Sequence, residues 1–530
     1  MKFPFPRLRP SAAAPARKAA HRPRHPSSVL PDSLALASLL WAATLWILSS
    51  AGAFTDPVHG LGRAGLLSAA LIALVGLLQL LSPQVLRERS RMALLVLIAL
   101  LALVPSRAIL YLENHTSLAP PLTAQFLLPL ALAPLLASVL AGAPTAIAIG
   151  FWNSLASALL FGGSLSVFAL GLIVTIVATI CAEDVRRRSQ IYRAGLFAGL
   201  AGMLYTVSQG AGHLAPLTLS AQAAAALASG IACAFVAAML IPLFELLFGI
   251  TTNLTLLELS DMGHPLLQRL AMEAPGTYHH SIVVANLAQA AARQIGANAL
   301  LVRVGAYFHD VGKLAKPEFF GENMRYRENP HDALAPSMSA LVITSHVKEG
   351  VGLARRFKLP ACVVDSVRQH HGTGLVSYFF HRAKQESADS GRAGAGRSNG
   401  HAVVEEDFRY DGPKPANREM AILMLADAVE AAARSLEKPT PGHLEGLVNE
   451  IADTRLRDGQ FDACNLTLAE LAAIKRSFVF TLANMLHVRI AYPSDETKSG
   501  QSAGKASATH AGDTQAGVVA LGANGRGAAD

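Results

Sequence analysis

A nearly continuous apolar stretch, residues 34–249, is the feature that most limits how this 530-residue chain can fold. Its few charged residues gather between apolar runs of about 20 residues, the length that an α-helix needs to cross a bilayer. Residues 250–494 have the composition of an ordinary soluble domain. The sequence therefore predicts a polytopic membrane protein joined to a soluble domain that is large enough for its own core.

Eight runs within this stretch are long and apolar enough to be spanning helices. They cover about 34–54, 64–82, 92–112, 121–141, 144–161, 164–182, 194–212 and 220–249. The first resembles a signal peptide in position, but no small-residue cleavage site is well placed after it, so we interpret it as an uncleaved anchor. The other seven form a transmembrane block over 64–249.

The basic residues predict the orientation. Residues 1–31 contain seven Lys and Arg and no acid, and the loops 83–91 and 183–193 are also basic. With the N-terminal segment 1–33 in the cytoplasm, these clusters and 250–494 fall on the same side, as the positive-inside rule requires. We therefore expect a multi-pass protein of the inner (plasma) membrane whose N-terminus and soluble domain are cytoplasmic. A basic N-terminus also suits nucleic acid, but before a membrane span it favours contact with the lipid bilayer, and we expect no DNA or RNA partner.

The soluble half predicts an all-α domain over 250–494. Apolar residues recur at helical spacing in several segments, and no convincing alternating strand is present. The segments are 281–296, 298–313, 339–357, 360–372, 418–436 and 467–490. Residues 385–404 are rich in Gly, Ser and Ala and predict a flexible insertion, and the tail 495–530 has a composition typical of disorder.

Histidines and acids recur inside or at the ends of these apolar helices, where a polar side chain is costly unless it is paired or ligated. They are His279, His280, His309, Asp310, His346, His370, His371 and Asp427. A single histidine in such a helix is more often a hydrogen-bonded core residue than a ligand. The conjunction changes this expectation, because imidazole plus carboxylate, without thiolate, suits first-row metals such as Fe, Mn or Zn.

Five histidine positions and two aspartates are too many for one tetrahedral site and about right for two ions that share a bridging carboxylate. Asp310 is the natural bridge, because its neighbour His309 binds one ion while its second oxygen reaches the other. Two ions a few Å apart activate a hydroxide and stabilise an in-line phosphoryl displacement. Lys313 lies one helical turn past Asp310, where it would neutralise a phosphate oxygen, although a solvated lysine at a helix end is the alternative.

The sequence around these residues resembles one family. The "HDVGK" motif (309–313) is similar to the signature of HD-domain phosphohydrolases. The wider pattern resembles the bacterial seven-transmembrane-receptor HD family, membrane phosphodiesterases of cyclic di-AMP. The segments that carry the resemblance are "LLELSDMGHPLLQRLAMEAPGTYHHS", "VGAYFHDVGK", "NPHDALAPSMSALVITSHVKEG", "QHHGTGLVSYF", "EDFRYDGPKP" and "AILMLADAVEAAARSL". The resemblance covers 250–494, and the spans over 64–249 match the membrane block of the family.

The resemblance implies a role for each matching residue. His280, His309, Asp310 and Asp427 would hold the first ion, and Asp310, His346, His370 and His371 the second. Asp310 and Lys313 would be catalytic, with Lys313 on the phosphate. The cofactors would be two divalent ions, Mn or Fe, and the reaction would convert cyclic di-AMP to pApA. His279 has no assigned role, and a homo-oligomer stays open.

The segment "FRYDGPKP" suggests contacts with substrate. Arg409 and Lys414 are cations in a loop stiffened by Pro and Gly, and Tyr410 offers a ring to an adenine or a hydroxyl to a phosphate. The equal alternative is a structured connector before the helix of Asp427.

One departure from the family concerns regulation. Members usually carry a large extracellular domain between the first span and the block, whereas here the connection is about 55–63, so sensing by such a domain is not expected.

Two alternatives to a cyclic di-AMP phosphodiesterase stay open. One is an HD phosphohydrolase of cyclic di-GMP, ppGpp or another nucleotide, although the GYP extension typical of cyclic di-GMP enzymes is absent. The other is a membrane receptor that binds a nucleotide without cleaving it.

Overall fold

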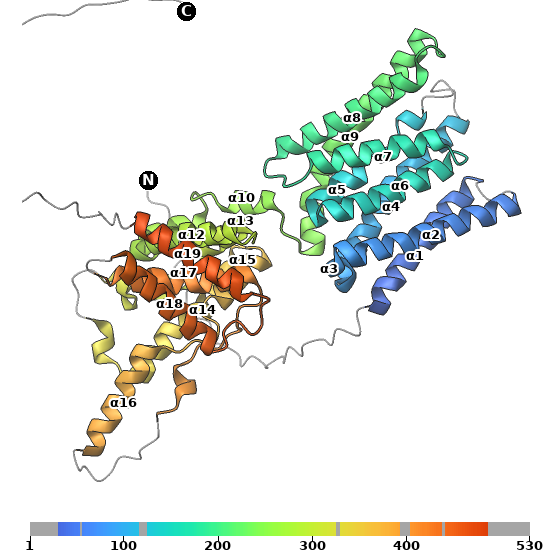
Figure 1. The fold of residues 1–530 in the computed structure, drawn as a ribbon. Coiled ribbons are helices and arrows are strands. Elements are labelled where there is room, and N and C mark those ends of the chain that lie inside the picture. The colour runs from blue at the N-terminus through green and yellow to red at the C-terminus, as the bar shows by residue number, and fades with distance from the viewer. Residues whose placement is uncertain are drawn as a thin grey trace, which may run out of the picture.

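The computed structural model describes residues 30–52, 56–115, 124–324, 329–392, 403–436 and 440–485. These ranges contain helices and turns and no strand, apart from an isolated antiparallel bridge between Leu375 and Arg409. The predicted all-α class is therefore confirmed. Figure 1 shows two helical bodies, the membrane block (described residues from 30 to 249) and the soluble domain (described residues from 250 to 485). The predicted N-terminal segment lies almost wholly outside the described residues, and the predicted tail lies entirely outside them.

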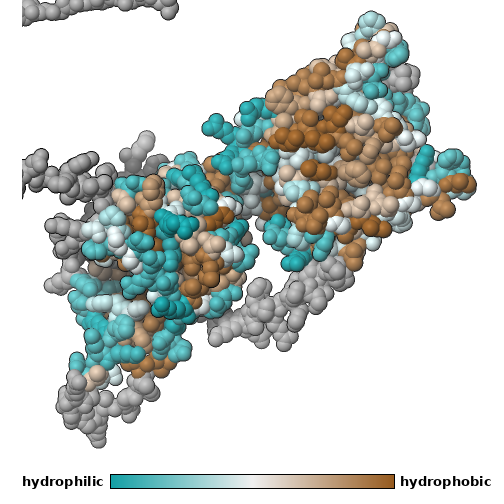
Figure 2. All heavy atoms as spheres, in the orientation of Figure 1, coloured by the Kyte–Doolittle hydropathy of each residue, from teal (hydrophilic) through white to brown (hydrophobic). Residues whose placement is uncertain are grey.

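The membrane block is a bundle of mostly long apolar helices. They are α1 (Leu30–Ser50), α2 (Pro57–Leu81), α3 (Pro83–Arg87), α4 (Arg89–His115), α5 (Leu132–Ala141), α6 (Ala143–Leu160), α7 (Leu165–Cys181), α8 (Arg188–Gly210) and α9 (Pro216–Phe248). In the described residues, α1, α2, α4, α6 and α9 are long and apolar enough to cross a membrane. Figure 2 shows their side chains as a broad hydrophobic face, unlike the mixed surface of the soluble domain. The protein is therefore a membrane protein, while the count of eight spans and their orientation stay predictions.

The predicted span over 121–141 differs from what the structure shows. Within its described part, a short 3₁₀ turn (Ala124–Phe126) precedes α5, which is ten residues long. Ten residues rise only about 15 Å, half of the hydrocarbon core. Pro129 lies before the helix and cannot donate a helical hydrogen bond, which favours a late start. Because nearly all of α5 is buried among α4, α6 and α9, it is an internal element of the bundle.

Small residues let α8 and α9 pack backbone to backbone. A Cβ atom added at Gly199 would lie 2.6 Å from the carbonyl oxygen of Leu227, and one added at Gly230 would collide with Gly199 itself. Glycine is required at this crossing because any side chain would separate the helices, and such contacts drive helix association where lipid offers no hydrophobic gain.

Short polar contacts join the two bodies. After α9 ends at the left-handed Gly249, Glu245 Oε1 accepts hydrogen bonds at 2.8 Å from the Thr252 amide and at 2.8 Å from the Thr255 hydroxyl. Asn253 donates to Asp184, in the turn between α7 and α8, at 2.9 Å. The predicted spans contain two charged residues, Glu245 and Arg107. Arg107 of α4 makes its contact within the membrane block, where it donates to the Ser50 carbonyl at the end of α1.

The soluble domain is a compact set of shorter helices. They are α10 (Asn253–Leu259), α11 (Pro265–Glu273), α12 (Pro275–Gln294), α13 (Ala299–Phe308), α14 (Pro336–Arg356), α15 (Ala361–Gln369), α16 (Ser377–Arg392), α17 (Arg418–Arg434), α18 (Pro441–Arg457) and α19 (Leu468–Met485). The 3₁₀ turns η3 (Val311–Ala315) and η5 (Gly321–Asn323) follow α13. Helix α12 lies at the centre, packed on α13, α17 and α19, and its inner face is lined with fully buried alanines together with Val284 and Leu287.

Local sequence signals set the ends of the helices that carry the site. Pro275 begins α12, where its missing N–H costs nothing, and Gly296 ends the helix with φ +64°. Asn298 then caps α13 by accepting from the Leu301 amide at 3.0 Å, and Asn417 caps α17 in the same way. These caps make α12 and α13 a tight hairpin.

The predicted flexible insertion was wrong for its first part. Helix α16 continues through 385–392, and Arg382 pairs with Glu386 one turn later at 3.0 Å. Such an i,i+4 pair supports an exposed helix that has little packing of its own. Residues 393–402 lie outside the described residues. Figure 1 shows α16 extending away from the body of the domain.

Candidate metal centre

The seven predicted ligands come from five helices or their ends and meet in the core of the soluble domain. His280 lies in the second turn of α12, and His346 lies in the middle of α14. His309 and Asp310 directly follow α13, His370 and His371 directly follow α15, and Asp427 lies in α17. Asp310 is 1% exposed and His309 is 0% exposed, so the middle of this charged centre is shielded from bulk water. His279 is exposed, and the cluster of ligand atoms does not include it.

Three of the histidines are oriented by the same backbone contact. Nδ1 of His309 donates to the Ala306 carbonyl at 2.7 Å, and Nδ1 of His370 donates to the Val367 carbonyl at 2.8 Å. His346 makes the corresponding bond to the carbonyl three residues before it. A carbonyl oxygen only accepts, so each Nδ1 carries the proton and each Nε2 faces the centre.

Asp310 lies between two groups of ligand atoms. Its Oδ2 is 3.2 Å from His309 Nε2 and 3.5 Å from His280 Nε2. Its Oδ1 is 3.4 Å from His346 Nε2 and 3.6 Å from His370 Nε2. Two sets of possible ligands result, and both contain Asp310. They are His280, His309, Asp310 and Asp427, and Asp310, His346, His370 and His371.

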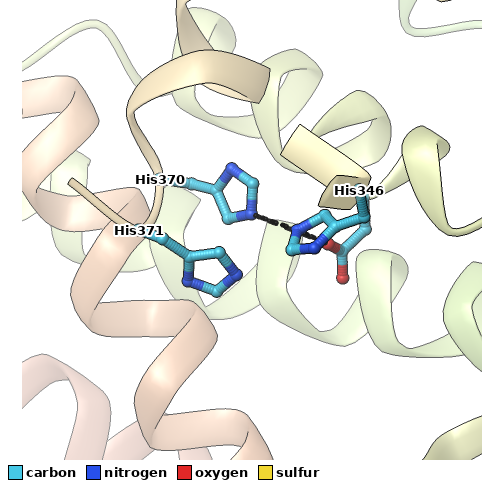
Figure 3. A group of neighbouring side chains, drawn as sticks. His346, His370 and His371 are labelled. Carbon is cyan, nitrogen blue, oxygen red and sulfur yellow. Dashed lines mark hydrogen bonds and ion pairs between the residues drawn. The ribbon is translucent and has the colours of Figure 1, made fainter. Parts of the chain in front are cut away.

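The contacts inside the centre fit cations. His346 Nε2 lies 3.3 Å from His370 Nε2, and Figure 3 draws this contact as a dashed line. Because both protons are on Nδ1, two lone pairs face each other. His309 Nε2 and Asp310 Oδ1 are buried without a hydrogen-bond partner among the described residues. Buried polar atoms without partners are rare and costly, and a bound cation would satisfy all of them. The donor set of imidazole and carboxylate is the one that divalent first-row metals prefer.

A glutamate that the sequence did not single out orients His280. His280 Nδ1 donates to Glu430, which leaves Nε2 3.0 Å from Asp427 Oδ1. Glu430 is 6% exposed, and its other oxygen accepts from Arg434 at 2.6 Å. Burial alone would raise the pKa of Glu430, but His280 and Arg434 lower it, so the carboxylate stays ionised. Its only sequence signal is a position three residues after Asp427, on the same face of α17.

A second unpredicted acid holds Lys313. The ammonium of Lys313 lies 2.7 Å from Asp310 Oδ2 and 2.7 Å from Glu322 Oε1 in η5. Glu322 also accepts from the Thr277 hydroxyl at 2.9 Å, which ties η5 to the start of α12. Burial would lower the pKa of Lys313, but these carboxylates raise it well above its usual value. Lys313 is therefore a fixed cation beside the bridging carboxylate, and nothing in its sequence neighbourhood signalled Glu322.

The environment of the centre shifts the pKa values of two of its histidines in opposite directions. Burial would lower the pKa of His309, but Asp310 and Asp427 overcome it and raise the pKa to about 10. Burial lowers the pKa of His346 to about 4, and the neighbouring His370 and Lys313 add to that effect. Burial also works to raise the pKa of Asp310, yet His309 and Lys313 hold it well below its usual range. The two ligand groups thus differ in charge before any cation binds.

The predicted substrate contacts lie at the edge of the centre. The ring of Tyr410 stacks on His371, with the ring centres 4.2 Å apart and the planes inclined by 28°. Arg409 donates to Asp458 at 2.9 Å and to Glu405 at 2.7 Å, so its charge is balanced within the protein. Lys414 lies 3.2 Å from Asp462. The structure therefore brings only Tyr410 of the three into contact with the centre.

A cavity of about 1090 Å³ leads to the centre. His371 and Asp427 form its inner end, and it continues along α17 and α18. The cations Arg409, Arg455 and Arg457 line it, together with the exposed ring of Tyr378. The acids Asp427, Glu450 and Asp458 also line it, and Asp458 pairs with Arg409, so Arg455 and Arg457 are the cations of this lining that form no salt bridge with another described residue. Its volume suits a ligand the size of a nucleotide or larger.

Two family descriptions match this chain. Residues 58–252 match "7TM receptor with intracellular HD hydrolase", and residues 277–432 match "HD domain". A protein of Bacillus subtilis (strain 168) named cyclic-di-AMP phosphodiesterase PgpH is 43% identical over 58% of this chain and 42% of its own length. Its namesake from Listeria monocytogenes serotype 1/2a (strain 10403S) is 38% identical over 70% of this chain and 51% of its own length. The chain thus spans about half the length of these curated relatives.

A solved structure of the L. monocytogenes PgpH HD domain is 43% identical, covers 42% of this chain and 100% of its own chain, and has a TM-score of 0.39. The match to the HD description spans the residues from α12 to α17, which hold all seven predicted ligands. The match to the receptor description spans the membrane block from α2 to α9. This chain belongs to the family of seven-transmembrane receptors that carry an intracellular HD hydrolase domain.

Proposed function

We propose that this protein is a membrane-bound, metal-dependent phosphodiesterase that hydrolyses cyclic di-AMP to the linear dinucleotide pApA. The observation that carries the proposal is the pair of histidine and carboxylate groups that share Asp310. The names of the B. subtilis and L. monocytogenes relatives support the substrate and the reaction. The proposed cofactors are two divalent ions, Mn or Fe.

The proposed first ion site is formed by His280, His309, Asp310 and Asp427, and the proposed second by Asp310, His346, His370 and His371. When bound, such a pair of ions supplies Lewis-acid stabilisation of the charge that develops at phosphorus. The protein holds the ligand atoms ready, since each backbone-bonded histidine presents Nε2 and Glu430 fixes His280. This preorganisation reduces the reorganisation needed during the reaction.

Lys313 is proposed to contact the scissile phosphate. In the structure its ammonium is shared between Asp310 and Glu322. Cations that neutralise Asp310 would weaken its hold on Lys313, so part of the lysine's charge becomes available to a phosphate oxygen beside the centre. Glu322 keeps the ammonium in place and excludes the alternative of a freely solvated lysine.

The cavity of about 1090 Å³ is the proposed site for the rest of the dinucleotide. A phosphate at the centre would place one nucleoside along α17 and α18, where Arg455 and Arg457 offer charge to the second phosphate. Tyr410, stacked on His371, is proposed to limit the movement of that ring and to contact a base or sugar. The protein is proposed to be multi-pass in the inner membrane, with its N-terminus and soluble domain cytoplasmic.

The test uses the full chain in lipid nanodiscs, supplied with Mn²⁺ or Fe²⁺ and with cyclic di-AMP, cyclic di-GMP and ppGpp in parallel. Wild-type protein should convert cyclic di-AMP to pApA fastest. Asp310→Ala should abolish turnover, because both ligand groups lose their shared carboxylate. Asp453→Ala is the matched control, since Asp453 is half exposed on α18 and, among the described residues, forms a salt bridge only with Lys475.

Two results would contradict the proposal. Faster turnover of cyclic di-GMP or ppGpp would show that the substrate is another nucleotide. Binding of cyclic di-AMP without cleavage, in the presence of either ion, would make the protein a receptor.

A further inference from the structure

A second cavity lies where the membrane block meets the soluble domain. Its volume is about 630 Å³, and it is separate from the metal centre. The membrane block contributes Asp184 and Arg186 from the turn between α7 and α8. The soluble domain contributes α10 and the turn of the α12–α13 hairpin, including Arg293 and Arg303. A ligand that fills this cavity would contact both bodies.

The charges that line this cavity are unequal. Arg186 pairs with Asp184 at 2.6 Å, and the other oxygen of Asp184 accepts from Asn253. Arg303 has neutral partners, since it donates to Gln289 at 2.7 Å and to the Tyr307 hydroxyl at 2.6 Å. Three guanidinium groups therefore face one carboxylate, and that carboxylate is already engaged.

The position of Arg293 makes the excess charge accessible. It is exposed in the last turn of α12 and forms no salt bridge with another described residue. Arg188 and Glu258, which do not line the cavity, pair with each other at 3.0 Å and add no net charge. The lining of the cavity therefore has an excess of two guanidinium charges. Such an excess is typical of sites for phosphate groups, because a guanidinium group forms paired hydrogen bonds to phosphate oxygens.

We propose that this cavity binds a phosphate-bearing anion, which joins Arg186 of the membrane block to Arg293 and Arg303 of the soluble domain. The ligand is a di- or trianionic phosphate, whether free or the headgroup of a lipid. Neither the metal centre nor its substrate cavity shares a lining residue with this site.

The hairpin provides a route from this site to the metal centre. Arg293 and His280 lie at opposite ends of α12, separated by about 20 Å at 1.5 Å per residue. Arg303 lies in α13, whose C-terminal end leads directly to His309 and Asp310. An anion that fixes the hairpin turn against the membrane block therefore fixes two helices that position predicted ligands. This coupling rests on the proposed function, whereas the binding does not.

The binding test uses the full chain in phosphatidylcholine nanodiscs with metal removed by EDTA. Calorimetric titrations with inorganic pyrophosphate and with short-chain phosphatidic acid are compared among wild-type, Arg293→Gln and Arg476→Gln chains. Arg476 is an exposed arginine on α19, outside the cavity, and serves as the matched control. Loss of a hydrogen bond between charged groups should weaken binding about tenfold in Arg293→Gln alone.

The two titrations identify the source of the phosphate. Weaker binding of pyrophosphate in Arg293→Gln, with Arg476→Gln unchanged, supports a site for free phosphate compounds. The same pattern with phosphatidic acid alone supports a lipid headgroup. If neither ligand distinguishes Arg293→Gln from Arg476→Gln, the proposed site is wrong.

The coupling is tested by turnover of cyclic di-AMP at a fixed free Mn²⁺ concentration, with and without the ligand that binds. Turnover should respond to the ligand in wild-type and Arg476→Gln chains and should not respond in Arg293→Gln. Binding without any change in turnover would overturn the coupling and leave the site. Binding without turnover under any condition would instead refute the proposed phosphodiesterase function.

Discussion

Glu430→Gln tests whether the hydrogen bond to His280 Nδ1 prepares the metal centre. In the wild-type protein, one carboxylate oxygen accepts from His280 and the other accepts from Arg434 at 2.6 Å. A glutamine has only one oxygen. If that oxygen stays on Arg434, the amide N–H faces His280 Nδ1 and favours the tautomer whose Nε2 carries the proton. A protonated Nε2 cannot bind a metal ion.

The size of the effect follows from the burial of this contact. Glu430 is 6% exposed, so water cannot replace the lost bond. Loss of a charge-assisted bond, together with the wrong tautomer, should cost about 1.4–2.7 kcal/mol in metal binding, or about ten- to a hundredfold in affinity. Only one of the two proposed ions should be affected, because Glu430 contacts His280 and none of His346, His370 and His371.

The assay is a titration of the metal-stripped chain with Mn²⁺. Binding is measured by calorimetry and by the electron paramagnetic resonance signal of the free ion. Glu273→Gln is the matched control, since Glu273 pairs with Arg269 at 2.7 Å in the same i,i+4 manner but on an exposed face. One binding step should weaken in Glu430→Gln and none in Glu273→Gln. Wild-type affinity at both steps in Glu430→Gln, with unchanged thermal stability, would refute the reasoning.

Three further predictions follow from the same structure. Because the pKa of His309 is about 10 without metal, this histidine must release a proton before it binds an ion. The affinity for Mn²⁺ should therefore rise by up to about tenfold per pH unit between roughly pH 7 and 9. Calorimetry in buffers of different ionisation enthalpy should detect the released proton. Gly312→Ala places a Cβ atom against the His346 carbonyl and should lower the free energy of unfolding by about 3 kcal/mol. Gly352→Ala, whose Cβ atom would enter open space, should raise the free energy of unfolding by about 0.5–1 kcal/mol. Thermal or chemical unfolding measures both changes. Arg409→Met breaks bonds to Glu405 and Asp458 and should cost about 1–2 kcal/mol of stability without changing KM; a higher KM at unchanged stability would support the predicted substrate contact.

The sequence was sufficient for the class of fold and for the neighbourhood of the centre. Helical periodicity predicted α12, α13, α14, α15, α17 and α19, with described ends that differ by up to six residues, because each buries one apolar face. The histidines and aspartates could be singled out because a polar side chain in an apolar helix needs a reason to be there. The structure brings all seven predicted ligands together, and their binding of ions stays a prediction.

The contacts around the centre depended on tertiary structure. Glu322 lies in a 3₁₀ turn whose position is set by Thr277, 45 residues earlier, and no local pattern indicates that contact. The partner of Arg409, Asp458, is 49 residues away in the chain, at the end of α18, so a cation that looked available for substrate is already paired. Helix α18 was not predicted, because its apolar face is narrow and its exposed face is highly polar.

The end of α9 limits how far the start of the soluble domain can lie from the membrane block. Leu243, Leu246 and Leu247 are 46%, 81% and 62% exposed, which is compatible with lipid around the last turns of this helix. Only the four residues 249–252 separate it from α10, and four residues extend at most about 14 Å. The start of the domain, at α10, is thereby held within about two Debye lengths of the end of α9 at physiological ionic strength.

A lipid surface potential falls to roughly a sixth of its value over that distance at physiological ionic strength. At about −30 mV, a typical value for an anionic leaflet, a dianion is depleted about tenfold directly at the lipid surface. A cyclic dinucleotide carries two such charges. For the proposed substrate, the concentration beside the lipid surface would therefore depend on the charge of the surrounding lipid, an effect that fades within about a Debye length of the bilayer.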